Sequence, residues 1–402
     1  MTLRRDCPVC GLYEPVLVYR QRFAVADDGR RITGYDVVEC GGCGAVYADG
    51  IPSQEALDGY YAVASKYEYL ECGGQAPASL EGSHRDMVER LLPLLPDQAS
   101  KIVDVGCGNG DVLGLLRRAG YVNLLGVDPA EHSAAAARRL YGVEVVPGGV
   151  LAMPPTAAQA GCIVLSAVLE HVREVAQALR EVSGMLAADG LLYIEVPDLE
   201  RFACDGSAPF QQFSVEHINY FTSDSLVHAA TAAGLGLAQT WSALRRTGTA
   251  PEPVVCAVFK LARTVVGHGT RDRVGPAAVR RYVAQSEALE TVERARLERL
   301  TAAGAPLIIW GAGTHMQHLL ARPPLADATI VAIVDANPRL HGVVVAGLTV
   351  SGPESIAGRD EPILVGSPAH EREIIDAARR VYGLENRFVS LTPPLAADCQ
   401  TL

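Results

Sequence analysis

Short apolar-rich runs and amphipathic stretches alternate along the middle of the chain. The apolar-rich runs occupy residues 102–105, 124–127, 143–146, 162–166 and 191–196. Such runs predict strands that are buried on both faces of a sheet, which is typical of parallel strands. Apolar residues at helical spacing lie between or before them, at 81–95, 112–116 and 133–141. We therefore expect an α/β fold in which helices cover a Rossmann-like, mostly parallel sheet.

Further elements follow this central pattern. Residues 223–233 predict a helix, with Ser223 and Asp224 as candidate caps. Two strands that close the sheet are expected next, at 235–241 and 253–261. A long amphipathic helix and a second Rossmann-like unit complete the chain, with the helix at 279–300 and strands at 307–310, 330–334 and 363–366. We divide the chain into three parts, at 1–75, 76–262 and 263–402.

Composition narrows the class of protein. The chain has 402 residues, 49% hydrophobic and 20% charged, as expected for a soluble globular protein of two or three domains. Its net charge of −11 argues against a nucleic-acid partner, which would require a basic face. No apolar run approaches the ~20 residues of a membrane span, and the first ten residues lack the apolar core of a signal peptide. We expect a cytoplasmic protein whose ten cysteines are thiols or metal ligands.

A glycine-rich turn, G-C-G-N-G, follows the strand at 102–105. Glycine tolerates positive φ and lets a ligand approach the backbone. Asp128 ends the next strand, where a carboxylate can accept both hydroxyls of a ribose. Asp104 precedes the turn and would repel a pyrophosphate, but it could pair with an amine. We therefore expect Gly106, Cys107 and Gly108 to bind S-adenosylmethionine (SAM), which carries cationic ammonium and sulfonium groups, rather than a dinucleotide.

The run at 101–128 resembles the first motif of class I SAM-dependent methyltransferases, which is an aliphatic strand, an Asp, Gly-x-Gly-x-Gly and an acid one strand later. The carboxyl ends of parallel strands meet at one edge of a sheet, so we expect Ser166 to lie beside the cofactor. His171 follows in an L-E-H-V run, 169–172, and is expected at the same cleft. Many small-molecule methyltransferases of this class carry a similar run.

Two C-x₂-C-G motifs lie near the start of the chain and contain Cys7, Cys10, Cys40 and Cys43. Four thiolates on two facing turns predict a closed structural zinc site. A redox role is less favoured, because redox C-x-x-C motifs occur singly and need a thioredoxin-like context. Iron–sulfur ligation remains open. Four tyrosines follow at 60, 61, 67 and 69; most should pack half-buried, and Tyr67 is the one that we expect to contact a ligand.

Residues 213–222, F-S-V-E-H-I-N-Y-F-T, fit neither a regular strand nor an amphipathic helix. Loops on the rim of an α/β sheet often carry function, so we assign Asn219 and Tyr220 to acceptor binding. The E-H-I-N-Y-F run, between a double-knuckle segment and a further α/β segment, resembles the sugar C-methyltransferases of antibiotic deoxysugar pathways. This resemblance implies C-methylation of a nucleotide-linked keto-deoxysugar in natural-product biosynthesis. It also implies that His217 is the base, with Glu216 beside it and His171 lining the pocket.

The residue types agree with this chemistry, because imidazole can remove a proton α to a ketone at neutral pH. Two departures from the family pattern, at 19–23 and 213–214, lie where substrate should sit, so O- or N-methylation of another small molecule remains open. An NAD-dependent oxidoreductase using the turn at Gly311 is a further alternative, although that turn lacks a third glycine. A third alternative function is that of a binding module that holds zinc and has a methyltransferase fold without catalytic activity.

His315, just after the Gly311 turn, could meet a phosphate or cap its helix. We expect a monomer or a homodimer.

Overall fold

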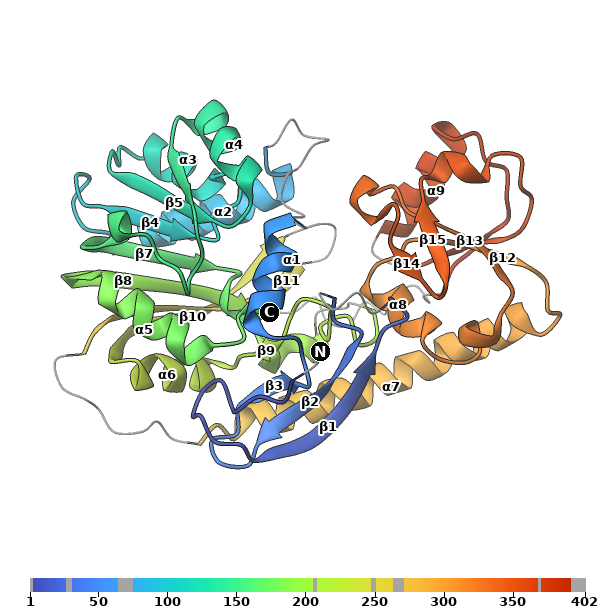
Figure 1. Ribbon diagram of the computed structural model, residues 1–402, viewed down its shortest axis with the longest axis horizontal. Helices are drawn as coiled ribbons and strands as arrows, with labels where there is room; N and C mark the ends of the chain where they lie inside the picture. Colours follow the sequence, from blue (N-terminus) through green and yellow to red (C-terminus); the bar gives the residue numbers. More distant parts are fainter. Residues whose placement is uncertain are drawn as a thin grey trace.

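The computed structural model describes residues 3–26, 31–63, 75–204, 208–246, 251–262, 271–367 and 370–391. Within these ranges the chain forms a four-stranded, a seven-stranded and a six-stranded sheet. In Figure 1 the seven-stranded sheet and its helices form the left part of the molecule and the six-stranded sheet forms the right part. The long helix α7 (Val274–Thr301) runs along the lower edge between them.

The seven-stranded sheet has the order β10-β11-β8-β7-β4-β5-β6. Its strands are β4 (Ile102–Val105), β5 (Leu124–Asp128), β6 (Glu144–Pro147), β7 (Ala160–Ser166), β8 (Leu186–Pro197), β10 (Leu235–Arg246) and β11 (Pro251–Leu261). The five adjacent strands β8, β7, β4, β5 and β6 are parallel to one another. Strand β11 runs antiparallel to both β8 and β10. The expected α/β sheet with two closing strands is confirmed. The strand order reverses between β4 and β7, which is where ligands bind in such sheets.

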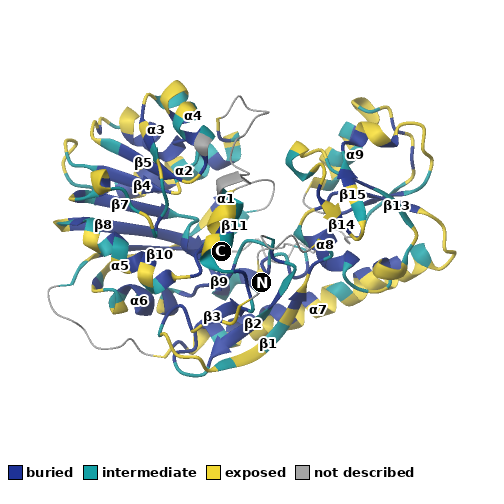
Figure 2. Cartoon of the chain, in the orientation of Figure 1, coloured by how far each residue is buried: buried dark blue, intermediate teal, exposed yellow. Residues whose placement is uncertain are grey.

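Helices cover both faces of this sheet. They are α2 (Ala78–Leu91), α3 (Asp111–Arg118), α4 (Glu131–Tyr141), α5 (Val175–Met185) and α6 (Ser223–Ala232). Figure 1 shows α2, α3 and α4 on one face and α5 and α6 on the other, and Figure 2 shows buried strands between helices whose outer faces are exposed. The N-cap of α6 is Thr222, which forms a capping box with Ser225, and not the expected Ser223 or Asp224.

The four-stranded sheet joins two distant parts of the sequence. Its order is β1 (Pro15–Arg22), β2 (Gly34–Cys40), β3 (Val46–Asp49) and β9 (Asn219–Tyr220), and all neighbours are antiparallel. Strand β9 therefore comes from the E-H-I-N-Y-F run, for which the sequence predicted a loop. Helix α1 (Gln54–Val63) follows β3. The apolar core beneath this sheet also includes side chains from the first half of α7, among them Val279 and Tyr282.

The C-terminal part is a second, smaller α/β unit, as predicted. Its sheet has the order β14-β15-β13-β12-β16-β17. The elements are β12 (Leu307–Trp310), α8 (Thr314–Leu320), β13 (Ile330–Val334), β14 (Val344–Val345), β15 (Leu348–Ser351), β16 (Ile363–Val365), α9 (Glu371–Arg380) and β17 (Phe388–Val389). Among the residues described, no helix has both the length and the apolar content that crossing a bilayer requires.

Asn219 ties three segments of the chain together. Its amide nitrogen donates to the carbonyl oxygens of Leu169 and Val172, both at 2.7 Å, while its amide oxygen accepts from the guanidinium of Arg5. Arg5 also donates to the carbonyl of Ile218 at 3.3 Å. Asn219 is only 3% exposed, so every one of these bonds is shielded from water. The amide therefore fixes the N-terminal segment, the L-E-H-V run and the E-H-I-N-Y-F run against one another.

We expect Asn219→Ala to lower the free energy of unfolding by about 3 kcal/mol, because it leaves two buried carbonyls and one guanidinium N–H without this partner. Urea denaturation followed by circular dichroism measures the change. The control is Asn123→Ala, since Asn123 is exposed and makes a single long bond of 3.4 Å to a backbone carbonyl. Equal effects of the two substitutions would contradict the supporting role of Asn219.

Candidate active site

The glycine turn predicted to bind SAM lies between β4 and α3. Gly106, Gly108 and Gly110 have φ of 74°, 50° and 84°, in the left-handed region that favours glycine. A Cβ on Gly106 would come within 2.8 Å of the Val168 side chain, so any other residue would crowd the loop after β7. The turn thereby brings its backbone to the edge where the strand order reverses.

Asp128, at the end of β5, orders this turn. One carboxylate oxygen accepts from the backbone N–H of Gly108 at 2.8 Å, and the other accepts from Ala130 N–H and the Ser133 hydroxyl. A carboxylate offers about four acceptor directions, so it can also accept from a ligand hydroxyl. The predicted cofactor residues Gly106, Cys107, Gly108 and Asp128 are thus brought together at one strand edge.

Asp104 lies on β4 directly before the turn and is 3% exposed. Burial, the largest cause, and the nearby carboxylates of Asp128 and Asp111 together raise its pKa to about 8. An acid in this position is stabilised in its charged form only by a cation. The carboxyl is therefore suited to a positively charged ligand and unsuited to a pyrophosphate.

The segment after β7 forms the other side of this edge. The hydroxyl of Ser166 donates to the carboxylate of Glu195 at 3.2 Å. Ala167 has φ of 56°, a strained value for a residue with a side chain, and it turns the chain sharply out of the sheet. A single 3-10 turn, Leu169–His171, follows. Glu170 and His171 therefore follow the end of β7, just after Val168, whose side chain adjoins Gly106 of the glycine turn.

The two predicted histidines meet across this edge. The ring centroids of His171 and His217 are 5.0 Å apart in an edge-to-face arrangement. His171 Nδ1 lies 3.1 Å from the carbonyl oxygen of Glu216 and 3.0 Å from the hydroxyl of Tyr61. Tyr60 donates to the Glu216 carboxylate at 3.2 Å. His217, Glu216 and His171, separated by 45 residues in sequence, therefore form one cluster covered by tyrosines from α1.

The backbone around His217 is held from several sides. Ser214 Oγ accepts from the N–H groups of Glu216 and His217, at 3.2 and 3.0 Å. The Tyr220 hydroxyl lies 3.1 Å from the carbonyl oxygen of His217 and 3.0 Å from the Tyr35 hydroxyl. Tyr35 in turn donates to the Ser214 carbonyl at 2.8 Å. These contacts set the position of the imidazole through its own backbone.

The residues predicted to bind the acceptor differ in their placement. Tyr67 lies outside the described residues. Tyr220 is buried and is engaged with Tyr35 and His217, and both amide hydrogens of Asn219 are used within the protein. Acceptor contacts of Tyr220 and Asn219 remain predictions, and the structure shows both residues supporting the loop instead.

Sequence reasoning missed three residues of this region. Tyr61 was noted only as one member of an aromatic cluster, Glu170 only as a letter of the L-E-H-V run, and Arg5 not at all. No local pattern marks Tyr61 and Arg5, because their partners in this region lie more than 100 residues away. Glu170 is next to His171 in sequence, but its complete burial depends on the packing of the fold. Only the approach of α1 and the N-terminal segment to the strand edge reveals them.

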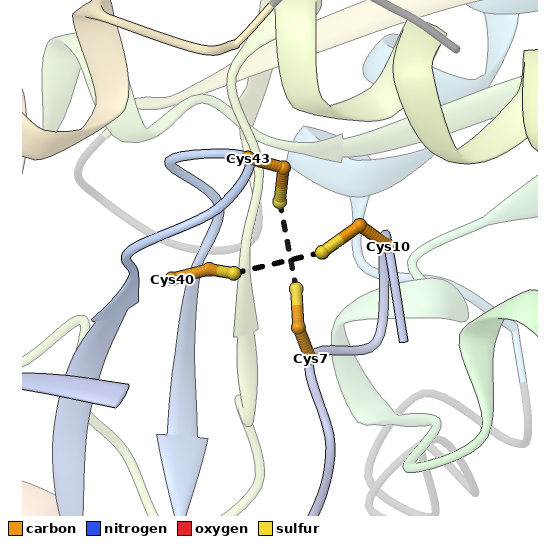
Figure 3. A group of neighbouring side chains, drawn as sticks. All are labelled: Cys7, Cys10, Cys40 and Cys43. Atoms are coloured by element: carbon orange, nitrogen blue, oxygen red, sulfur yellow. Dashed lines mark hydrogen bonds between the residues drawn. The ribbon is translucent and has the colours of Figure 1, made fainter. Parts of the chain in front are cut away.

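The four predicted cysteine ligands converge (Figure 3). The Sγ atoms of Cys7 and Cys43 are 3.6 Å apart, as are those of Cys10 and Cys40, and all four lie within 4.8 Å of one another. A tetrahedral zinc ion with Zn–S bonds of about 2.3 Å separates its sulfurs by about 3.8 Å, so the cluster fits such an ion. The second knuckle also holds the start of α7, since Cys43 O accepts from Asp272 N–H at 2.8 Å.

The C-terminal turn after β12 holds no comparable set of groups among the residues described. His315 is 3% exposed and its Nε2 lies 3.4 Å from a carboxylate oxygen of Glu293 on α7. The structure therefore directs this side chain to α7, and its contact with a phosphate remains a prediction. Asp335 accepts from the N–H of Ala312 at 2.8 Å and orders the turn.

Comparison with known proteins agrees with this site. Residues 79–240 match the family described as a methyltransferase domain. The C-methyltransferase NovU of Streptomyces niveus is 24% identical over 391 residues, which cover 91% of this chain and 87% of that protein. A probable S-adenosylmethionine-dependent methyltransferase of Mycobacterium tuberculosis is 27% identical over 155 residues, 38% of this chain and 53% of that protein.

Among solved structures, the PH0226 protein from Pyrococcus horikoshii OT3 aligns with a TM-score of 0.39 at 19% identity, over 50% of this chain and 98% of that one. The family match covers the five parallel strands β4 to β8, together with the glycine turn, Asp128 and the histidine cluster, and it ends within β10. The family match over residues 79–240 and the two relatives in sequence identify the chain as a SAM-dependent methyltransferase.

Proposed function

We propose that the enzyme transfers the methyl group of SAM to a carbon atom of a nucleotide-linked keto-deoxysugar in natural-product biosynthesis. The observation that carries this proposal is the cluster of His217, Glu216 and His171 at the strand edge that bears the glycine turn. The similarity to NovU, a C-methyltransferase, extends over 91% of the chain and so reaches well beyond the methyltransferase domain matched at residues 79–240.

Methylation at carbon requires a base, because a carbon atom next to a ketone becomes nucleophilic only when it loses a proton. We assign this step to the imidazole of His217, whose ordinary pKa near 6.5 suits proton removal at neutral pH. The acceptor's C–H electron pair then forms the enolate, and the proton remains on His217. SAM, when bound, supplies an electrophilic methyl group on its sulfonium, and the enolate carbon displaces S-adenosylhomocysteine from it. His217 afterwards returns its proton to solvent.

The surroundings of His217 support this role. His171 packs edge-to-face against the imidazole of His217, and Tyr61 of α1 packs in turn against His171, so this side of the half-buried imidazole is covered. Its backbone is held by Ser214 and Tyr220, so the ring does not have to be oriented during the reaction. We assign Asp128 to the ribose of SAM, Asp104 to its cationic end, and the turn from Gly106 to Gly108, with Ser166, to the remaining contacts.

We assign a zinc ion to Cys7, Cys10, Cys40 and Cys43. In this role the metal replaces a hydrophobic core that the small N-terminal segment cannot supply. Because Arg5 lies two residues before the first ligand and bonds to Asn219, the metal also supports the segment that carries His217.

The proposed reaction is tested by incubating the protein with SAM and a thymidine-diphosphate-linked 4-keto-6-deoxysugar as acceptor probe. Mass spectrometry and NMR then identify the product. The expected product carries a new C–CH₃ bond, and solvent deuterium enters the α-position in the absence of turnover. A methyl group found on oxygen or nitrogen, with no such exchange, would reject carbon as the acceptor atom.

For the base, we expect His217→Ala to lower kcat by about 100-fold or more, since general-base catalysis contributes 10²–10⁴. The dissociation constant of SAM, measured by calorimetry, should stay within about twofold of wild type. The control is His341→Ala, which removes an exposed imidazole in the C-terminal unit. Unchanged turnover in His217→Ala would reject its role as base.

For the cofactor site, we expect SAM affinity to rise with pH up to about 8 and to do so less in Asp104→Asn. The raised pKa of Asp104 keeps it neutral below about 8 in the empty protein, so binding of a cation must displace its proton at lower pH. The amine of SAM titrates in the same range, so the measured quantity is the difference between wild type and Asp104→Asn in calorimetric titrations. Asp189→Asn, which alters an exposed carboxyl, should follow wild type. Parallel pH curves for Asp104→Asn and wild type would remove Asp104 from the site.

For the metal, we expect about one zinc per chain by elemental analysis, and none in Cys40→Ser. Loss of the ion should lower the melting temperature and, through Arg5 and Asn219, the methyl-transfer rate. Cys204→Ser is the matched control, because Cys204 is an exposed cysteine outside the cluster. Iron in place of zinc in the purified protein would contradict the assignment.

A further inference from the structure

Glu170 is a buried carboxyl group that the proposed mechanism does not use. The residue is fully buried, and neither carboxylate oxygen has a hydrogen-bond donor among the described residues. An ionised carboxylate in this condition would lose its hydration without compensation, which costs several kcal/mol. A neutral carboxylic acid avoids most of that cost, and its O–H becomes a donor. The surroundings of Glu170 must therefore provide an acceptor for a proton or a cation for a charge.

The cation nearest in the fold is already paired. Arg245 on β10 donates to the carboxylate of Glu252 at 2.7 and 3.2 Å and lies 3.5 Å from Glu195. Two carboxylates from β11 and β8 thus share this one guanidinium. Among the described residues, neither Arg245 nor any other cation forms a hydrogen bond with the carboxyl oxygens of Glu170. The ion-pair cluster therefore leaves Glu170 without a counter-ion.

An acceptor lies on the other side of Glu170. Its Oε1 is 4.0 Å from Nε2 of His171. The Nδ1 of the same ring is 3.1 Å from the carbonyl oxygen of Glu216, which can only accept, and 3.0 Å from the Tyr61 hydroxyl, which can accept or donate. We place the ring hydrogen on Nδ1, because both of these neighbours can accept it. In the neutral ring Nε2 is then an acceptor. Glu170 Oε1 and His171 Nε2 would then present lone pairs to each other, and a proton on the carboxyl group would turn this repulsion into a hydrogen bond.

We propose that Glu170, as a neutral acid, donates a hydrogen bond to Nε2 of His171 and is a positioning residue for His217. The gap must close by about 1 Å to reach hydrogen-bond length. This bond fixes the tautomer of His171, whose Nδ1–H then holds the carbonyl of Glu216, the residue before His217. A chain of contacts thus runs from a buried acid to the backbone of the base. The inference rests on the proposed function only in naming His217 as that base.

The charges around the pair are consistent with a retained proton. The pKa of Glu170 is raised to about 8, chiefly by burial; Arg245 opposes this shift, and the carboxylates of Glu252 and Glu195 add to it. On the side of the imidazole, His171 is faced by His217 and by the hydroxyl of Tyr61. Glu170 therefore keeps its proton at neutral pH and loses it as pH rises through about 8.

The first test needs no acceptor substrate. Long-range ¹⁵N NMR of histidine-labelled protein, with His171 assigned from His171→Gln, reports which ring nitrogen carries hydrogen. At pH 7 we expect Nδ1–H and an accepting Nε2 in wild type and in Glu170→Gln, whose amide N–H replaces the acid O–H. As the pH is raised through about 8, the His171 signals of wild type should shift because Glu170 loses its proton. The same shift should be absent in Glu170→Gln, which has no carboxyl group at this position. An imidazolium or an Nε2–H ring in wild type at pH 7 overturns the proposal.

The second test is the pH profile of kcat at saturating SAM, with the thymidine-diphosphate-linked 4-keto-6-deoxysugar as acceptor. Glu170→Gln should retain wild-type turnover at pH 7 and extend it to higher pH, because its donor cannot ionise. Glu170→Leu removes the donor and should lower kcat about 100-fold with SAM affinity unchanged, as expected when a reacting group is misplaced by about 1 Å. Glu89→Gln, an exposed acid on α2, is the charge-matched control.

The outcomes separate this inference from the proposed function. If Glu170→Gln is as inactive as Glu170→Leu, the residue acts as a carboxylate and the proposal fails while His217 can still be the base. If His217→Ala is active, the base assignment fails, but the NMR result still decides the bond between Glu170 and His171. Binding of Mn²⁺, detected by its paramagnetic resonance and lost in Glu170→Gln, would show that the carboxyl holds a cation and would also overturn the proposal.

Discussion

The buried amide of Asn219 is the contact on which the arrangement of the active site depends. A single side chain joins the turn after β7, the strand β9 and Arg5 of the N-terminal segment. Two of its bonds are made to backbone carbonyls and fix the course of the main chain after β7, and the third holds the side chain of Arg5. Because this amide is shielded from water, its hydrogen bonds have no competitor and the three segments are held as one unit. His171 and His217 meet at 5.0 Å because these segments cannot move apart.

Buried carboxyl groups set the electrostatics of the strand edge. Asp104 beneath the glycine turn and Glu170 beneath the histidines both have a pKa raised to about 8, chiefly by burial. Their expected uses differ according to what each one faces. Asp104 lies under a turn suited to a cationic ligand, which would stabilise the charged form, whereas Glu170 faces an imidazole nitrogen, which would stabilise the acid. One sheet edge can thus hold a cation at one strand end and a proton at the next.

The cysteine cluster influences parts of the molecule that are far from it in sequence. Cys43 O accepts from Asp272 N–H, and a side chain on Gly44 would collide with the carbonyl oxygen of Asp272. Arg271 donates to the carbonyl oxygen of Gly41 in the same knuckle. The knuckle therefore holds the start of α7, and α7 carries the C-terminal sheet at its far end (Figure 1). The position of the C-terminal unit depends in this way on the fold of the first 50 residues.

The sequence by itself determined the elements whose pattern is local. Apolar-rich runs marked the parallel strands, the glycine turn and Asp128 marked the cofactor edge, and the C-x₂-C spacing marked the cysteine cluster, because each of these features is complete within a few residues. The sequence also placed His171 at a strand end, as the parallel topology requires. It could not show that the E-H-I-N-Y-F run supplies a strand to the N-terminal sheet, since β9 is only two residues long and forms only through pairing with β3. The packing of distant segments likewise decided that Asn219 supports the loop, that His315 faces Glu293, and that Glu170 is fully buried. These roles come from burial and from partners far along the chain, which no short stretch of sequence contains.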